Sequence, residues 1–283
     1  MRYFVGEKRS SGRDWAMSGT RTQEALVGEQ FGARAAAYLK SAVHATGADL
    51  EALAALVEGE GKARVLDLGC GAGHVSFNAA PRAREVEPHR HHPAGAEQVA
   101  ARLVVEERVF AAADGLWVVL AGKDLVGVVE HLPFEDASFD CVLSRYSAHH
   151  WRDFDAGLRE AARVLRQGGV AGFVDAVAPG RPVLDTFLQS IELLRDPSHV
   201  RDYSRAEWEA ALNRAGLLPG KVCAYRIRLE FGVWIERMKT PKVLADAIRA
   251  LQRAMSESVT KYFAIDAEGS FDLDIALFEA RKP

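Results

Sequence analysis

The stretch Val65-Leu66-Asp67-Leu68-Gly69-Cys70-Gly71-Ala72-Gly73-His74-Val75-Ser76-Phe77 decides how the rest of this chain is interpreted. It opens with mainly apolar residues, continues with three glycines at alternate positions, and ends with residues that can start a helix. Alternate glycines permit a tight strand-to-helix turn and let a ligand approach the backbone closely. Asp67 stands at the carboxyl end of the expected strand, the edge at which open α/β sheets bind ligands. The stretch therefore predicts a ligand-binding loop.

The glycine spacing separates two kinds of nucleotide-binding fold. Dinucleotide enzymes use G-x-G-x-x-G, whereas this chain has Gly69-x-Gly71-x-Gly73 with an acid two residues before the first glycine. This pattern resembles the first motif of class I S-adenosylmethionine (SAM)-dependent methyltransferases, hhD-x-G-x-G-x-G. The resemblance implies that Asp67, Gly69, Cys70, Gly71 and Gly73 bind the cofactor, with the acid ordering the loop or meeting the methionine ammonium. A glycine-rich turn of an unrelated α/β domain is the alternative.

The composition is that of an ordinary soluble protein. The chain has 283 residues, 48% of them apolar and 27% charged, which suffices for a sizeable core in one large domain or two small ones. A net charge of −3 gives no overall attraction to nucleic acid. The apolar runs are too short to span a bilayer, and residues 1–20 lack the apolar core of a secretory signal. Cys70, Cys141 and Cys223 form no C-x-x-C pair, so we expect a reducing cytoplasm and no metal site.

Strand and helix patterns alternate along most of the chain. Residues 1–22 are polar and without periodicity, so we expect a disordered N-terminal extension. Apolar residues then recur at helical spacing, and further segments alternate as strand and helix: strands 63–68, 139–144, 170–177, 221–231 and 271–280; helices 25–57, 74–80, 154–165, 184–195 and 204–215, and one starting at 240. This alternation predicts a mostly parallel sheet with helices around it.

Two further strings strengthen the resemblance. Residues 30–47 and Ser144-Arg145-Tyr146-Ser147-Ala148-His149-His150-Trp151 match the pattern of a small bacterial group within the ubiquinone/menaquinone-biosynthesis-like branch of these methyltransferases. The resemblance implies an α/β, Rossmann-like fold with a seven-stranded, mostly parallel sheet and helices on both faces. The domain would cover 23–283, with a helical lid (23–58) and acceptor-side insertions (180–215, 232–263). It also assigns cofactor contacts to Val128 and Val129, at the adenine, and to Arg145.

The chemistry of methyl transfer needs few catalytic groups. Positioning and exclusion of water supply most of the catalysis, and a base is needed only when the acceptor must lose a proton. His149, His150 and Tyr146 follow the strand of residues 139–144 and are the candidate catalytic residues. Adjacent residues leaving a strand point opposite ways, so we expect only one histidine to face the acceptor, and favour His150. Alternatively, one histidine stacks on Trp151 and the other caps the next helix.

The sequence favours a SAM-dependent methyltransferase that acts on a small apolar or aromatic acceptor. The alternative is a protein of the same fold with impaired cofactor binding and no turnover. A nicotinamide oxidoreductase is disfavoured by the glycine spacing. Asp175 is more readily explained as a turn acid than as a catalytic residue, and the histidines at 89, 91 and 92 as part of a solvated loop. The oligomeric state is left open.

Residues 82–127 depart from the family pattern. An acid normally ends the second strand and binds the ribose hydroxyls, as the carboxylate about 20 residues past the loop does in dinucleotide enzymes. Counting from Asp67 puts that acid at Arg90, and Glu87, the nearest substitute, is followed by Pro88. A displaced reading frame, restored near Gly127, would explain the departure. It predicts a poorly formed second strand and helix, and a weaker SAM site.

The nucleotide sequence of the gene tests this hypothesis. Residues 88–96 can be encoded as CCC-CAC-CGA-CAT-CAC-CCC-GCA-GGT-GCT. Read one nucleotide later, this encodes Pro-Thr-Asp-Ile-Thr-Pro-Gln-Val-Leu, the form the family shows after its second strand. We expect sequencing to find that string in the displaced frame; any other string there contradicts the hypothesis.

Overall fold

The computed structural model describes most of the chain after residue 45. The described residues are 22–23, 26–27, 46–58, 61–71, 73–90, 111–112, 115–116, 125–126 and 128–283. The N-terminal extension predicted for residues 1–22 and most of the predicted lid therefore lie outside them, except for short pieces and helix α4 (Ala48–Ala55).

One mixed sheet organises the fold. Its seven main strands follow the order β5-β2-β1-β6-β7-β10-β9. Their bounds are β1 (Arg64–Leu68), β2 (Glu85–Arg90), β5 (Leu125–Val126), β6 (Phe139–Arg145), β7 (Leu165–Ala178), β9 (Leu218–Leu229) and β10 (Phe271–Arg281). The strands from β5 to β7 pair in parallel, whereas β10 is antiparallel to both its neighbours. The predicted mostly parallel, seven-stranded Rossmann-like sheet is confirmed. A short strand, β8 (Tyr203–Ser204), also pairs with β7, and β3 (Ala111–Ala112) pairs with β4 (Gly115–Leu116).

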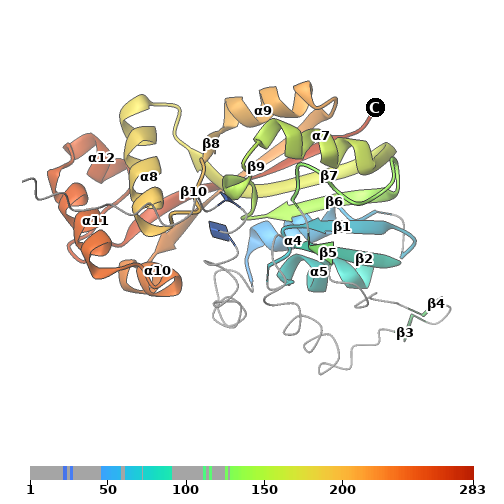
Figure 1. Ribbon diagram of the computed structural model, residues 1–283, viewed down its shortest axis with the longest axis horizontal. Coiled ribbons are helices and arrows are strands. Elements are labelled where there is room, and N and C mark those ends of the chain that lie inside the picture. Colours follow the sequence, from blue (N-terminus) through green and yellow to red (C-terminus); the bar gives the residue numbers. More distant parts are fainter. Residues whose placement is uncertain are drawn as a thin grey trace, which may run out of the picture.

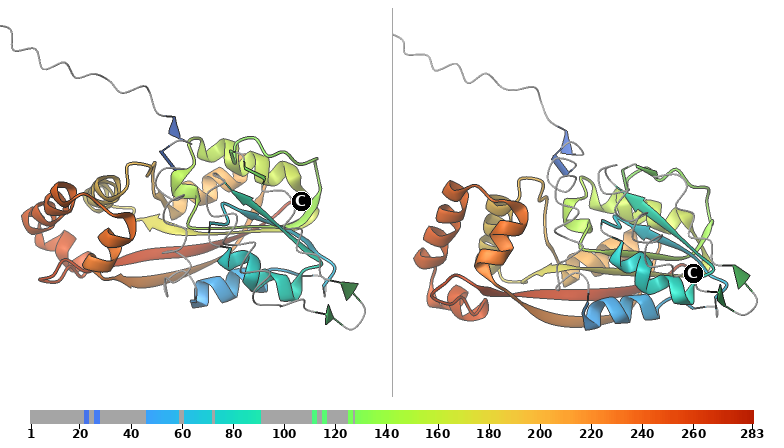
Figure 2. Two further views of the ribbon diagram at one scale, coloured as in Figure 1. Left: turned by 60° about the horizontal axis from the view of Figure 1, so that its bottom comes forward. Right: turned by 90° about the horizontal axis from the view of Figure 1, so that it is seen from below.

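Helices cover both faces of the sheet (Figures 1 and 2). One face carries α4 and α5 (His74–Ala79), followed by the short helix η1 (Ala80–Arg82). The other face carries α7 (Phe154–Val164) and α9 (Arg205–Arg214). Each layer buries its own apolar cluster against the strands, one including Leu53, Val65 and Val75 and the other Leu158, Phe173 and Trp208. Burial on both faces explains the continuous apolar runs in the central strands, Cys141 to Leu143 in β6 and Val170 to Val174 in β7.

Local signals start the helices where the sequence predicts. The side chain of Asp153 accepts a hydrogen bond from the amide of Ala156 (2.8 Å) and caps α7. Ser204 and Glu207 form a reciprocal capping box at α9. The strand expected at 170–177 is longer than predicted, because β7 begins at Leu165, directly after α7.

A third group of helices lies at one end of the sheet (Figure 1). It consists of α8 (Pro182–Arg195), α10 (Phe231–Met238), α11 (Lys242–Ala254) and α12 (Glu257–Tyr262). These helices fall within the segments 180–215 and 231–263, near the bounds expected for the acceptor-side insertions. They pack around a separate apolar cluster that includes Phe187, Trp234 and Phe271. Among the described residues, no helix is long and apolar enough to cross a bilayer.

The prediction of a poorly formed second strand is wrong for β2. This strand pairs with β1 at five positions, from Arg64–Glu85 to Leu68–His89, and Val86 is buried at 3% exposure. The edge of β1 presents backbone N–H and C=O groups that require partners, so even a charged segment pairs there. Glu87 lies opposite Leu66. Burial and then the charge of Glu85 raise its pKa to about 6, against the opposing charge of Arg64. The helix expected after β2 lies outside the described residues.

Two helical glycines provide a test of the packing under α7. A Cβ added at Gly157 would lie 2.6 Å from a ring carbon of Trp151, which is itself 1% exposed. At Gly232 of α10, no atom of the described residues lies within 4 Å of the added Cβ. We expect Gly157→Ala to lower the free energy of unfolding by about 1–3 kcal/mol through overpacking, and Gly232→Ala to raise it by about 0.4–1 kcal/mol. Urea unfolding checks both, and equal effects would contradict the packing.

Candidate active site

The glycine loop connects β1 to α5 with three residues in the left-handed region. The φ angles are 70° at Gly69, 51° at Gly71 and 82° at Gly73, conformations that glycine adopts without steric cost. The amide of Gly73 donates to the carbonyl of Cys70 (2.7 Å) and closes the turn. Among the described residues, a Cβ added at Gly71 would meet only the carbonyl oxygen of Gly69, at 3.8 Å. No other described residue fills the space in front of Gly71, as a loop that cradles a ligand requires.

Asp67 joins the end of β1 to the first turn of α5. Its side chain is fully buried, and Oδ2 accepts hydrogen bonds from the amide (3.0 Å) and the hydroxyl (2.6 Å) of Ser76. Of the two roles that the resemblance implies for this acid, the geometry favours ordering of the loop.

The ends of β1 and β6 lie level with each other. Leu68 pairs with Ser144, whose hydroxyl donates to the Leu68 carbonyl (3.1 Å). The chain then turns at Tyr146, a non-glycine residue with φ 53°, whose amide donates to the Val174 carbonyl (2.9 Å). Parallel pairing thus brings the glycine loop and the segment from Tyr146 to His150 to the same edge of the sheet.

The remaining predicted cofactor residues lie in packed surroundings. Nε of Arg145 donates to Asp49 of α4 at 2.6 Å, with both side chains buried, and the guanidinium stacks over the Tyr146 ring at 4.5 Å. Val129 is fully buried in the cluster under α7, and Val128 is half-buried. Arg145 thus ties β6 to α4, and the adenine role of the two valines stays a prediction.

His149 and Asp175 form a short hydrogen-bonded pair. Nδ1 of His149 lies 2.6 Å from Oδ1 of Asp175, and its amide donates to Oδ2 at 3.2 Å. Burial lowers the pKa of His149. The charge and hydrogen bond of Asp175, with the charges of Asp202 and Glu192, outweigh this effect and raise the pKa to about 9. Sequence reasoning had favoured a turn acid at position 175; the structure instead places this carboxylate against a candidate base.

His150 has a different environment. It is 8% exposed, its Nδ1 lies 3.1 Å from the Ser198 carbonyl, and burial together with the charge of His149 lowers its pKa to about 3. Both histidines line one cavity, and their ring centroids are 4.1 Å apart. The expectation that only one faces this space is wrong, because they lie in the tight helix η2 (Ala148–His150) and not in extended backbone. The alternative of a histidine cap also fails, since Asp153 caps α7.

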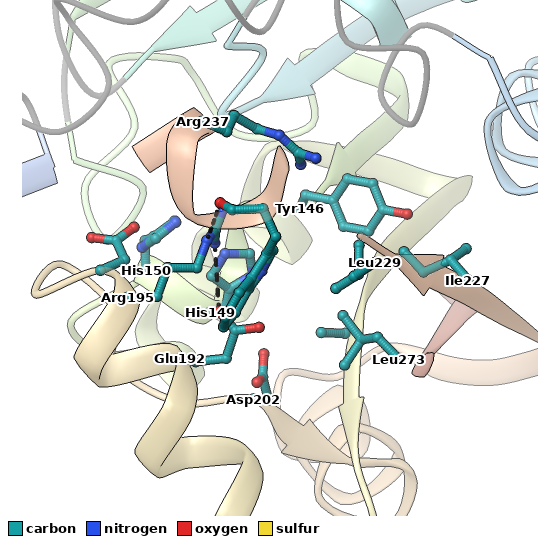
Figure 3. A pocket seen from close by; sticks show the side chains of 13 residues that line it. Tyr146, His149, His150, Glu192, Arg195, Asp202, Ile227, Leu229, Arg237 and Leu273 are labelled. Carbon is teal, nitrogen blue, oxygen red and sulfur yellow. Dashed lines mark hydrogen bonds and ion pairs between the residues drawn. The ribbon is translucent and has the colours of Figure 1, made fainter. Parts of the chain in front are cut away.

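The cavity has a volume of about 80 Å³ and two unlike walls (Figure 3). Ile227, Leu229 and Leu273 form an apolar wall from β9 and β10. The rest of the lining includes titratable groups from η2, from α8 and the segment after it, and from α10: His149, His150, Glu192, Arg195, Asp196, Asp202 and Arg237. Sequence reasoning missed the last five, because single charged residues far from any motif carry no signal of convergence.

His149, Asp175 and Asp202 offer oxygen or nitrogen atoms that all lie within 4.8 Å of one another. Such a group could hold a cation, although His149 and Asp175 already satisfy each other. The expectation of no metal stays a prediction. Of the other histidines considered, His89 lies in β2, and those at 91 and 92 lie outside the described residues.

This chain resembles known proteins in sequence and in fold. A family model described as a methyltransferase domain matches residues 66–173. The uncharacterized methyltransferase YcgJ of Bacillus subtilis is 36% identical over 211 residues, which cover 75% of this chain and 79% of YcgJ. The crystal structure of YcgJ matches with a TM-score of 0.74 at 30% identity, covering 83% of this chain and 97% of that one. The uncharacterized protein YafE of Escherichia coli is 47% identical over 156 residues, 55% of this chain and 75% of YafE.

A structure of geranyl diphosphate C-methyltransferase from Streptomyces coelicolor, in complex with Mg²⁺, geranyl diphosphate and S-adenosyl-L-homocysteine, shares the fold alone. Its TM-score is 0.56 at 18% identity, and the match covers 83% of this chain and 79% of that one. The strand order and the similarity to YcgJ over most of both chains lead to one conclusion: this chain belongs to the class I SAM-dependent methyltransferase superfamily.

Proposed function

We propose that the protein transfers a methyl group from SAM to a small acceptor with an apolar or aromatic body. The observation that carries the proposal is the placement of the open glycine loop and the His149–Asp175 pair at neighbouring strand ends. When bound, SAM supplies an electrophilic methyl group. Asp67 orders the loop, and the backbone of Gly69 to Gly73 receives the methionine end. The apolar wall of the cavity supports an apolar acceptor body.

We assign the role of general base to His149 and not to His150. Asp175 holds Nδ1 of His149, which leaves Nε2 as the atom that takes the proton of the acceptor. A carboxylate that orients an imidazole in this way also stabilises its protonated form. His150, buried and bonded to the Ser198 carbonyl, supports the shape of the turn. Tyr146 lines the same cavity and would contact the acceptor.

A protein without turnover is the second candidate, because of the residue at the end of β2. Arg90 lies one residue past the Leu68–His89 pair, at the place where the family has the ribose-binding acid. Loss of one charge-assisted hydrogen bond weakens binding by about 1.5–3 kcal/mol. Calorimetric titration with SAM separates the two candidates, since the second predicts weak or no binding. A screen of candidate metabolites for release of S-adenosylhomocysteine then tests turnover.

The cysteines and the net charge support proposals on the cell compartment and on the kind of partner. On the buried thiols of Cys70 and Cys141 we propose a reducing, cytoplasmic setting. The small net negative charge supports a small-molecule acceptor over nucleic acid as partner.

Substitution of Gly71 tests the cofactor loop. We expect Gly71→Val to weaken SAM binding at least tenfold in calorimetry, because the branched side chain would fill the open space in front of the loop. Gly216 is a matched control, since its φ is also positive (80°) and no atom lies within 4 Å of an added Cβ. Gly216→Val carries the same backbone strain away from the site and should bind SAM normally. Equal SAM affinity in the two variants would refute the assignment of the loop.

The pH dependence tests the base. Only neutral His149 accepts a proton, so kcat/KM should rise with pH through an apparent pKa near 9, above the ordinary value of 6.5. In Asp175→Asn the raising charge is gone and burial lowers the pKa, so the rise should move to lower pH. His149→Ala should lower kcat by about 10²–10⁴-fold with little change in SAM affinity. A profile that keeps its pH midpoint in Asp175→Asn would contradict this role.

A further inference from the structure

Three carboxylates line the cavity and a fourth, Asp175, is bonded to His149; three of these four have partners. Each of the three accepts a hydrogen bond or lies in an ion pair: Asp175 with His149 (2.6 Å), Asp196 with the hydroxyl of Ser198 (2.6 Å), and Glu192 with Arg195 (3.5 Å). The fourth carboxylate is Asp202. This side chain is what distinguishes the polar side of the cavity from an ordinary set of ion pairs.

Asp202 carries a buried oxygen that no described residue satisfies. The residue is 2% exposed, and its Oδ2 has no hydrogen-bond partner in the part of the chain that the structure describes. The nearest basic atom, Nε2 of His199, lies 3.9 Å away, beyond hydrogen-bond distance. A buried acceptor without a partner destabilises the folded protein, because it has lost its hydrogen bonds to water. Such a group is therefore suited to receive a donor from a bound molecule.

The backbone around Asp202 is held in place without using its carboxylate. The amide of Asp202 donates to Oε1 of Gln189 (3.1 Å), and Nε2 of Gln189 donates to the carbonyl of Asp202 (2.8 Å). Both bonds anchor the residue to α8. The carboxylate is thus preorganised at the cavity, and binding of a partner need not order this segment.

When its groups are ionised, the polar side of the cavity has an excess of one negative charge. Glu192, Asp196 and Asp202 line it and Asp175 is bonded to His149, whereas the cationic groups are Arg195, Arg237 and His149, whose pKa of about 9 keeps it protonated at neutral pH. Burial and then the charge of Glu192 raise the pKa of Asp202 well above its usual value. Crowded, buried carboxylates with raised pKa values are relieved by a nearby positive charge. The electrostatics therefore favour a cationic molecule at this end.

The shape of the cavity adds the second requirement. Figure 3 shows Ile227, Leu229 and Leu273 on the side opposite Glu192 and Asp202. A molecule that satisfies both sides has an apolar body and one positively charged donor group. A bare metal ion would use the carboxylates and leave the apolar wall without a contact.

We propose that the methyl acceptor is a primary or secondary amine with an apolar body, and that Oδ2 of Asp202 binds its ammonium group beside Nε2 of His149. This inference rests on the proposed function and specifies its substrate class. Asp202 lies close enough for this role, since its carboxylate is within 4.8 Å of the ligand atoms of His149 and Asp175.

The reaction balances with the groups present. The ammonium gives one proton to Nε2 of neutral His149, and the amine nitrogen keeps its lone pair. That lone pair forms the new nitrogen–methyl bond while the sulfur–methyl bond breaks and its electron pair stays on sulfur. The products are the methylated ammonium, neutral S-adenosylhomocysteine and a proton that His149 later releases to solvent.

The test compares two probes of the same shape and different charge. Benzylamine, which is cationic at neutral pH, and benzyl alcohol are titrated into the whole protein by calorimetry, with and without S-adenosylhomocysteine. We expect benzylamine to bind more tightly by about ten- to a hundredfold, the effect of one charge-assisted hydrogen bond. Asp202→Asn should abolish this preference. Asp185→Asn, which removes a partly exposed carboxylate paired with Arg201, should retain it.

Three results would overturn the inference: equal binding of the two probes, an amine preference that survives in Asp202→Asn, or tight Mn²⁺ binding that Asp202→Asn abolishes. The last would assign the carboxylates to a metal ion. A melting curve of Asp202→Asn, together with its S-adenosylhomocysteine affinity, shows that the variant is folded. If the protein prefers benzylamine but does not bind S-adenosylhomocysteine, the proposed function alone is refuted. If it binds S-adenosylhomocysteine but does not prefer benzylamine, only the inference of an amine acceptor is refuted.

Discussion

The parallel pairing of β1 with β6 is the constraint on which the rest of the site depends. The two strands are far apart in sequence, yet Leu68 and Ser144 lie opposite each other and their chains leave the sheet at the same edge. The backbone hydrogen bonds between β1 and β6 fix the position of the glycine loop relative to η2, the short helix that carries His149 and His150. A shift of register by one residue would move every side chain of β6 to the other face, where the packed neighbours have different shapes. Close packing in both layers therefore holds the register.

The cavity beside η2 is formed by other elements of the fold. Strands β9 and β10 are antiparallel and extend beyond the parallel part of the sheet, where they carry α10, α11 and α12. Their apolar residues form one wall of the cavity, while α8 and the segment after it supply the other (Figure 3). The glycine loop thus belongs to the parallel core of the fold, and the cavity is formed where the added helices meet that core. If the loop binds the cofactor and the cavity the acceptor, as we propose, this division allows acceptor specificity to change without disturbing the loop.

Charge pairing organises the polar side of the cavity. The short bond from Asp175 keeps positive charge on His149, while the same positive charge and burial keep His150 and His199 neutral. Three histidines close together therefore have three different environments, and only one of them is suited to exchange protons near neutral or basic pH. Oδ2 of Asp202 accepts no hydrogen bond from the described residues, which is why we propose that a cationic acceptor binds there.

The sequence by itself determined the sheet and the glycine loop, because these depend on short-range periodicity and glycine conformation. It also indicated His149 and His150, but it misjudged their orientation, since a short helical turn replaced extended chain. The charged composition of the second strand predicts that it forms poorly, but pairing with β1 overrode this local preference. Only the tertiary structure brought Asp175 to His149 and placed Glu192 and Asp202 beside them. Carboxylates on separate elements converge through packing over long distances in sequence, and no local pattern records that convergence.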